Sequence, residues 1–256
     1  MKKIPAVVIM LGLIACGASS EVTRKLTVNP DKTRLILFSD ESGKEVARRQ
    51  LDKDGVLLKE AGKVPEGPVK QYFKDGKVQA EWNFKNGKEE GLFREYWDDG
   101  KLCWEGKYSG GKPEGIKRFY YKTGKLGYED EYRAGIQTGR KSFYESGKVN
   151  TEGVFKDGKE IERKWLRENG KLQGECAILN GKETGIRKEY YENGCREESN
   201  YRDGKKDGAM NVFSKSGNLN LETNFKDGKE NGVRSYYSAD GSLQKQEVYK
   251  DDKLVK

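Results

Sequence analysis

The stretch Gly91–Glu114 reads GLFREYWDDGKLCWEGKYSGGKPE, and the next stretch, Gly115–Thr138, reads GIKRFYYKTGKLGYEDEYRAGIQT. The two stretches share the positions of their glycines, rings and charges. Outward from this pair, similar units recur every 23 or 24 residues. They open at Gly67, Gly91, Gly115, Gly139, Glu162, Gly185, Gly208 and Gly232. Such a period indicates a repeat architecture in which each unit packs only against its neighbours.

Each unit contains two short runs of residues joined by a turn that holds a glycine. Five positions after the opening residue, seven units carry an aromatic side chain: Tyr72, Tyr96, Tyr120, Tyr144, Tyr190, Phe213 and Tyr237. The fifth unit offers Trp165 or Leu166 near that place. Asp-Gly, Asn-Gly, Ser-Gly or Thr-Gly follows, and such pairs favour turns because glycine enters positive φ without a Cβ clash.

The second run alternates apolar and polar positions. Apolar side chains stand two and eight positions after the turn glycine in most units, and a glutamate stands five positions after it. These glutamates are Glu81, Glu105, Glu129, Glu152, Glu175 and Glu222. Positions two and eight share one face of a strand, and position five lies on the other face. The pattern predicts an all-β fold, an elongated single-layer antiparallel β-sheet of tandem β-hairpins.

The spacing of Gly, aromatic, Asx-Gly-Lys, Glu, aromatic and Gly-Lys resembles the MORN-repeat variant of bacterial YwqK-type proteins. The resemblance covers residues 67–256 and, more faintly, residues 34–66. It implies a long antiparallel sheet built from hairpins. Proteins of this kind are often labelled antitoxins of toxin–antitoxin systems, and that label implies no chemistry.

The first residues have the composition of an export signal. Residues 1–15 combine two early lysines with an apolar segment shorter than the roughly 20 residues of a membrane span. Residues Leu13–Cys16 resemble a bacterial lipobox, which implies cleavage before Cys16 and acylation of its sulfur. The alternative is an ordinary secretory signal with an incidental cysteine. Gly17 stands where lipoproteins retained in the inner membrane carry Asp, so the resemblance implies the outer membrane if the cell is Gram-negative.

The remaining chain divides into three predicted segments. Residues 16–33 are polar and are expected to form a flexible tether. Residues 34–66 hold a strand-like run and turns at Gly43 and Gly55, so we expect a degenerate N-terminal capping hairpin or hairpins. Residues 67–256 are expected to hold the eight repeats, with no shift in composition that would mark another domain.

The overall composition is polar for a folded chain. Hydrophobic residues make up 34% and charged residues 36%, and the mean hydropathy is −0.97. Aromatic residues that recur in register argue against disorder, because a thin sheet needs only local burial. The net charge of +8 is spread along turns and edges, so nucleic acid is not an expected partner. Weak attraction to anionic lipid or polymer is compatible with this charge.

Histidine is absent from the sequence, which excludes Ser-His and Cys-His catalysis and metal sites that need imidazole. We expect no enzymatic activity, no cofactor and no metal site. The recurrent glutamates are interpreted as a polar row opposite Lys70, Arg94 and Arg118. A row of carboxylates that binds Ca²⁺ is the alternative.

Three cysteines follow Cys16. Cys103, Cys176 and Cys195 show no zinc or redox spacing. The expected strand register places Cys195 too far along its strand for a disulfide with Cys176. We expect buried or incidental thiols.

The aromatic rows are the sharpest candidates for function. In one interpretation they are a packing stripe, in which Tyr144, for example, stacks on Val149. In the other, a one-layer sheet leaves an aromatic face open, and exposed Tyr and Trp supply contact area at low entropic cost. The candidate partner-binding residues are Tyr72, Trp82, Tyr96, Trp97, Trp104, Tyr120 and Tyr121.

These features favour a non-catalytic lipoprotein of the bacterial cell envelope that is anchored through Cys16. Its repeat sheet is expected to serve as a scaffold that binds a partner protein. One alternative is an antitoxin or immunity protein that neutralises a toxin. Another is a binder of envelope glycan or anionic lipid.

Overall fold

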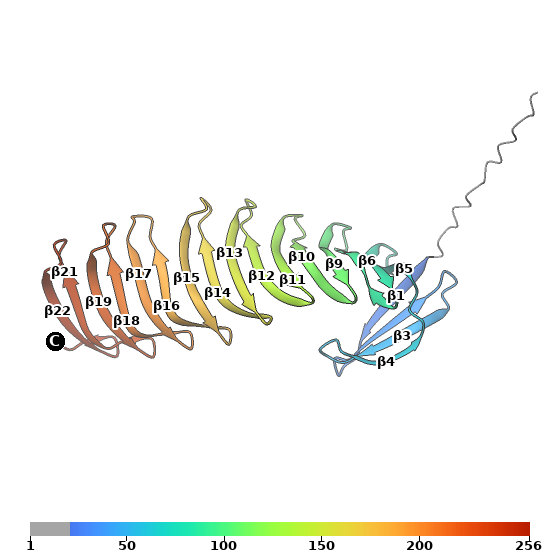
Figure 1. Ribbon diagram of the computed structural model, residues 1–256, viewed down its shortest axis with the longest axis horizontal. Coiled ribbons are helices and arrows are strands. Elements are labelled where there is room, and N and C mark those ends of the chain that lie inside the picture. Colours follow the sequence, from blue (N-terminus) through green and yellow to red (C-terminus); the bar gives the residue numbers. More distant parts are fainter. Residues whose placement is uncertain (1–20) are drawn as a thin grey trace, which may run out of the picture. The chain divides into compact units, whose positions relative to one another are not determined.

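The computed structural model describes residues 21–256 (Figure 1). These residues form 23 strands, and no helix is assigned among them, so the predicted all-β class is confirmed. They fall into two compact units, Met1–Lys63, described from residue 21, and Val64–Lys256. The predicted signal segment 1–15 and the predicted lipidation site Cys16 lie outside the described residues.

The first unit contains four strands that pair antiparallel in chain order. They are β1 (Val22–Val28), β2 (Arg34–Ser39), β3 (Glu45–Leu51) and β4 (Leu57–Gly62). The predicted turns are present: the Gly43 N–H donates to the Asp40 carbonyl at 2.9 Å, and an equivalent bond closes the turn at Gly55. Phe38 and Ala47, opposite each other in β2 and β3, are buried.

Strand β1 corrects the predicted tether. Residues 16–33 were expected to be flexible, but Val22–Val28 form a strand whose residues from Thr23 pair with β2. Four of its seven residues are β-branched, and such side chains favour a pleated backbone over a coil. Residues 16–20 of the predicted tether lie outside the described part of the chain.

The second unit contains sixteen long strands, two for each repeat. They are β5 (Gly67–Tyr72), β6 (Val78–Lys85), β8 (Gly91–Tyr96), β9 (Leu102–Ser109), β10 (Lys112–Tyr120), β11 (Leu126–Arg133), β12 (Ile136–Phe143), β13 (Val149–Lys156), β14 (Lys159–Leu166), β15 (Leu172–Leu179), β16 (Lys182–Tyr190), β17 (Arg196–Arg202), β18 (Lys205–Phe213), β19 (Leu219–Lys226), β21 (Gly232–Tyr237) and β22 (Leu243–Lys250). Three short strands are β7 (Lys88–Glu89), β20 (Lys229–Glu230) and β23 (Lys253–Leu254). Each long strand pairs antiparallel with the next long strand, so this unit is a meander in one layer (Figure 1).

A β-bulge lies beside the turn in seven of the eight hairpins of residues 64–256. In the second repeat the register shifts between Glu95 and Tyr96, so that Tyr96 pairs with Leu102. The hairpin of the sixth repeat, β16–β17, pairs without a shift and places Tyr190 opposite Arg196. That unit is one residue shorter, and the missing residue is the one that forms the bulge elsewhere.

The fourth repeat corrects one expected contact. Phe143, and not Tyr144, pairs with Val149. This unit also lacks one residue before its turn. As a result, Phe143 takes the place in the pairing that Tyr96 has in the second repeat. Tyr144 is instead the first residue of the turn, the place that Trp97 and Tyr121 hold in earlier repeats.

The sheet of the second unit has two chemically different faces, because opposed residues of paired strands point to the same side. We call one the ring face, defined by Trp82, Phe93, Trp104, Phe119 and Tyr128. We call the other the ladder face, defined by Lys70, Glu81, Arg94, Glu105, Arg118 and Glu129. The ring face carries most of the unit's apolar packing, with Val69 and Phe93 buried.

Glycines make room for rings that lie across a neighbouring strand, and Gly106 and Gly174 show the closest approaches. Gly106 faces Phe93, and a Cβ there would lie 2.6 Å from that ring. Gly174 faces Trp165, and a Cβ there would lie 2.4 Å from the indole. Because real carbon atoms do not approach so closely, both rings depend on glycine opposite them.

Candidate binding faces of the repeat sheet

The ladder face carries a continuous row of side chains, one from each long strand. Positive and negative members alternate along the first twelve strands. In order they are Lys70, Glu81, Arg94, Glu105, Arg118, Glu129, Lys141, Glu152, Lys164, Glu175, Lys188 and Glu198. Arg118 lies between two carboxylates, 3.7 Å from Glu105 and 2.8 Å from Glu129. The predicted placement of the glutamates opposite Lys70, Arg94 and Arg118 is therefore confirmed.

Tyrosines on the same face are bound to this row. The Tyr96 hydroxyl donates to Glu81 at 2.8 Å, and the Tyr120 hydroxyl donates to Glu105 at 2.8 Å. Burial and these carboxylates raise the pKa of both phenols. Each bond reaches from one repeat to the preceding one. Tyr96 and Tyr120 therefore hold neighbouring repeats together, which is the packing interpretation of this row.

The ring face begins with a cluster in the first two repeats. Trp82 stacks on Phe93 with ring centroids 5.1 Å apart, and Tyr108 meets both rings at 5.6 and 5.2 Å. These offset and edge-on arrangements are the preferred ones for aromatic pairs. Phe93 is buried, whereas Trp82 and Tyr108 are half-buried.

A second ring cluster spans the second and third repeats. Phe119 lies at its centre and contacts four rings, with centroid distances between 4.9 and 6.1 Å: Trp97, Trp104, Tyr121 and Tyr128. Tyr121 is the outermost member and is 51% exposed. It also lines an open hollow of about 600 Å³ with Leu126 and Phe143. This cluster therefore connects five rings and has an exposed edge at Tyr121.

The seven candidates named from the sequence do not form one surface. Tyr96 and Tyr120 lie on the ladder face, and Tyr72 holds the same repeat position. Trp82, Trp97, Trp104 and Tyr121 belong to the ring clusters. Sequence reasoning missed Phe93, Phe119 and Tyr128, although their parity relative to Arg94, Arg118 and Glu129 places them opposite the ladder.

Trp97 also has a structural role. Its indole N–H donates to the Tyr120 carbonyl in the next repeat at 3.1 Å. Tyr144 makes the equivalent contact to Leu166 at 2.7 Å. The first residue of the turn thus links successive repeats, and a substitution at Trp97 disturbs this link as well as the ring surface.

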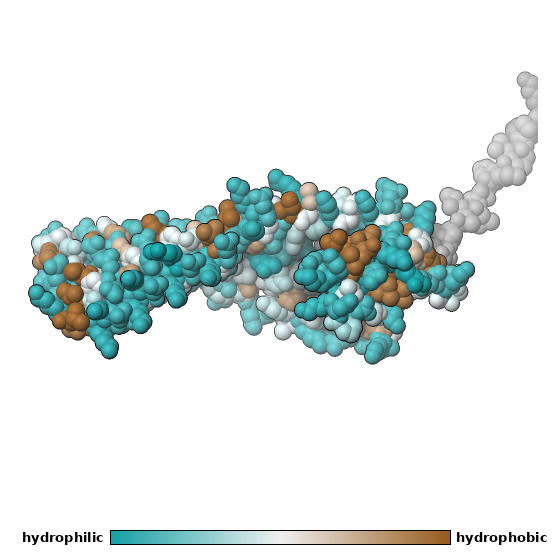
Figure 2. Space-filling model, turned by 90° about the horizontal axis from the view of Figure 1, so that it is seen from below, coloured by the Kyte–Doolittle hydropathy of each residue, from teal (hydrophilic) through white to brown (hydrophobic). Residues whose placement is uncertain are grey.

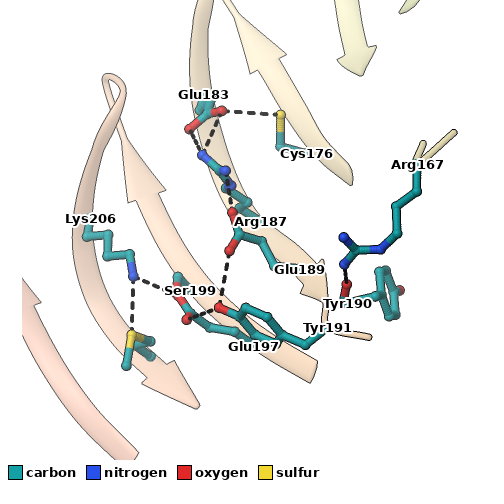
Figure 3. Close-up of polar contacts among 11 residues, drawn as sticks. Arg167, Cys176, Glu183, Arg187, Glu189, Tyr190, Tyr191, Glu197, Ser199 and Lys206 are labelled. Atoms are coloured by element: carbon teal, nitrogen blue, oxygen red, sulfur yellow. Dashed lines mark hydrogen bonds and ion pairs between the residues drawn. The ribbon is translucent and has the colours of Figure 1, made fainter. Parts of the chain in front are cut away.

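Beyond the third repeat the ring face becomes a network of paired charges (Figure 3). Arg187 binds Glu183 at 3.1 Å and also pairs with Glu189. Lys206 donates to Glu197 at 2.7 Å. Further along the chain, Arg234 pairs with Glu230. The charged side chains of this half of the face therefore pair with one another.

Lys117 is the exception among the cations of this face. Its Nζ lies 4.1 Å from the Trp104 ring centroid and 5.4 Å from that of Phe93. Burial lowers the pKa of Lys117, and the carboxylates of Glu95 and Asp130 act in the opposite direction. The ammonium therefore sits between the two ring clusters, partly withdrawn from water.

The three described cysteines are free. Cys103 and Cys176 are buried, and burial raises the pKa of the Cys103 thiol and raises that of Cys176 to about 11. Residues 21–256 hold no group of three or more His, Cys, Asp or Glu arranged to bind a metal ion. No helix long and apolar enough to cross a membrane is found in the same residues.

Exposed apolar residues are scattered over a largely hydrophilic surface (Figure 2). On the ladder face, the residue after the opening glycine is exposed in several repeats: Leu92, Ile116, Ile186 and Val233. These side chains stand one to three repeats apart. They do not form a connected cluster like the rings around Phe119.

The sequence of the hairpins also matches a known repeat family. Five segments match the MORN repeat variant: residues 65–86, 113–134, 140–157, 183–203 and 230–251. These segments are MORN repeats of the variant type. They fall in the first, third, fourth, sixth and eighth hairpins, so the predicted repeat type is confirmed. None of the curated protein sequences matches the chain.

Several solved structures are distantly similar to this chain. A crystal structure of a GtfA/B complex bound to UDP and GlcNAc matches with a TM-score of 0.21 and 7% identity, over 51% of this chain and 22% of that one. A protein of unknown function from Bacteroides caccae matches with a TM-score of 0.20 and 13% identity, over 76% and 79%. TcdB2-TccC3 without its hypervariable C-terminal region matches with a TM-score of 0.19 and 12% identity, over 88% and 18%. The chain thus spans about a fifth of the length of the first and third proteins. TM-scores this low do not indicate a shared function.

Proposed function

We propose that this MORN-repeat chain is a non-catalytic scaffold of the bacterial cell envelope, anchored through lipid on Cys16, that binds a partner protein with its ring face. The observation that carries the proposal is the cluster around Phe119, whose outer ring, Tyr121, is 51% exposed. Exposed, connected aromatic side chains are characteristic of protein interfaces, where they supply most of the binding energy.

The ladder face is a poorer candidate for the binding surface, which supports the choice of the ring face. Its charges pair with one another across the strands, and its tyrosines bind its glutamates. Exposed ion pairs of this kind contribute about 0.2–1 kcal/mol each and leave few groups to recognise a ligand. Compared with the ladder face, the rings around Phe119 therefore offer the better surface for a partner.

Recovery of the partner from solubilised membranes tests the binding surface. A tagged wild-type chain is compared with Tyr121→Ala and Trp104→Ala. The matched control is Tyr191→Ala, which removes a 43% exposed tyrosine from the same repeat position in the sixth repeat. We expect both ring-cluster variants to lose most of the partner and the control to retain it, at a temperature at which all four chains are folded. Equal recovery from all four chains rejects the ring face.

Two further outcomes correspond to other functions. Rescue of growth when the chain is co-expressed with a toxic neighbouring gene product would assign an antitoxin role. Sedimentation with peptidoglycan or with anionic vesicles, sensitive to Trp104→Ala, would assign a glycan or lipid ligand to the same rings. Either result would contradict the proposed scaffold function and assign the other function to the chain.

The anchor is tested separately. We expect the wild-type chain to fractionate with membranes and Cys16→Ser to be released. Serine lacks the sulfur that would carry the lipid, and stable attachment of the protein depends on its acyl chains. Cys195→Ser is the matched control, since it removes a cysteine of the repeat array. Membrane association of Cys16→Ser would contradict lipidation at this residue.

A further inference from the structure

Seven cations of the second unit lie over aromatic rings. They are Lys117, Arg140, Arg187, Arg196, Lys206, Arg234 and Lys245. Six of these have a carboxylate oxygen in ion-pair contact. Of these seven cations, Lys117 is the one without such a partner.

The carboxylates nearest to Lys117 do not supply the missing contact. Asp130 is opposite Lys117 in the strand pairing, but Arg140 occupies both of its oxygens, at 2.6 and 2.9 Å. Gln137 also donates to Asp130, at 2.8 Å. Glu95 acts on Lys117 only at a distance and forms no ion pair with it. The ammonium keeps its ring contacts and lacks an oxygen acceptor among residues 21–256.

The surroundings of Lys117 favour an acidic group with apolar neighbours. Phe93 and Trp104 flank the ammonium, and Phe119 and Tyr121 continue the apolar surface from Trp104. A carboxylate that binds an ammonium already shielded from water by rings makes a stronger contact than it would in open solvent. The apolar side chains next to that carboxylate would cover the rings.

We propose that Lys117, Phe93 and Trp104 form the recognition site for an acidic side chain of the partner protein, with an adjacent apolar residue on the Phe119 cluster. This inference rests on the proposed function, because it names the partner chemistry of the same ring face. Charge complementarity selects the occupant: the site offers one unpaired cation among rings, whereas the neighbouring cations of the face are already neutralised.

Two matched tripeptides test the site on the purified full-length protein. The first is acetyl-Leu-Asp-Phe-amide, and the second replaces Asp by the isosteric Asn. Binding is followed by NMR through the indole N–H of Trp104. We expect saturable shifts with the Asp peptide in the millimolar range and at least about fivefold weaker binding of the Asn peptide.

Variants assign this preference to individual residues. Lys117→Gln is expected to bind both peptides equally, and Lys117→Arg to retain the preference because it keeps a cation over the rings. Glu95→Gln is expected to strengthen Asp-peptide binding about twofold to fivefold, since it removes a competing carboxylate. Lys141→Gln, which removes a lysine from the ladder face, is the control and should change nothing.

Several results would overturn the inference. They are equal binding of the two peptides by the wild type, no saturable shift up to about 10 mM peptide, or a preference for Asp that survives in Lys117→Gln. Glucuronate binding as tightly as the Asp peptide would assign a sugar acid to the site and would also overturn it. Loss of partner recovery in Tyr121→Ala combined with equal peptide binding would leave the protein-binding proposal standing and reject only the acidic group.

Discussion

Single side chains connect one repeat to the next at fixed places. The Tyr96 hydroxyl reaches Glu81 in the preceding repeat, and the Trp97 indole reaches the backbone of Tyr120 in the following one. Such links matter in a one-layer sheet because few side chains are fully buried. At this scale, the sequence identified Tyr96 and Trp97 but did not separate their structural roles from binding, because hydrogen bonds between repeats depend on register.

Removal of the Tyr96 hydroxyl tests its link to Glu81. We expect Tyr96→Phe to lower the free energy of unfolding by about 0.5–1.5 kcal/mol, because Glu81 loses a half-buried donor. Tyr121→Phe is the control, since its exposed hydroxyl makes no hydrogen bond in the described residues, and should change stability by less than about 0.5 kcal/mol. Urea denaturation measures both, and equal effects would argue against the repeat-to-repeat bond.

Thiol reactivity tests the burial of the cysteines. Cys176 is 3% exposed and has a pKa of about 11, so little thiolate is present at neutral pH. We expect iodoacetamide to label Cys195 first at pH 7, because it is less buried, and labelling of Cys176 to rise as the pH approaches 11. Mass spectrometry of peptides from the native protein gives the order. Faster labelling of Cys176 at pH 7 would contradict its placement.

The hairpin is the element that repeats, and its local chemistry explains why it was predictable. Each turn is closed by a bond such as that from the Gly100 N–H to the Trp97 carbonyl at 2.9 Å, and Asp-Gly or a similar pair indicates the turn directly. Bulges were not predictable in the same way. One missing residue moved Phe143 into the place expected for Tyr144, and this shift becomes visible only through pairing with the next strand.

Glycine opposite an aromatic ring is a second feature of the element, and it can be tested in the fifth repeat. We expect Gly174→Ala to cost about 1–3 kcal/mol, because the new Cβ would lie 2.4 Å from Trp165 and 2.8 Å from the Lys188 carbonyl. Gly139→Ala is the control: its nearest atom is 3.4 Å away, so the change should stay below about 1 kcal/mol. Equal urea midpoints for the two variants would show that Trp165 does not pack across Gly174.

The two units of the chain differ in how far the sequence predicted them. The regular period revealed the repeats of the second unit, whereas β1 was missed because Val22–Val28 carries no glycine turn and no aromatic marker. The chemical division of the second unit into a ladder face and a ring face was only half predicted. The ladder followed from recurrent glutamates, but the ring clusters combine residues of neighbouring strands, and their contacts depend on the register of the whole array.

Photo-crosslinking in living cells tests most directly whether the ring face receives a protein. Benzoylphenylalanine is placed at Tyr121 on the ring face or at Leu92 on the ladder face, positions that are 51% and 64% exposed in the same half of the array. We expect the Tyr121 position to yield a covalent adduct with one defined protein and the Leu92 position to yield none. An adduct from Leu92 alone, or no protein adduct from either position, would contradict this expectation.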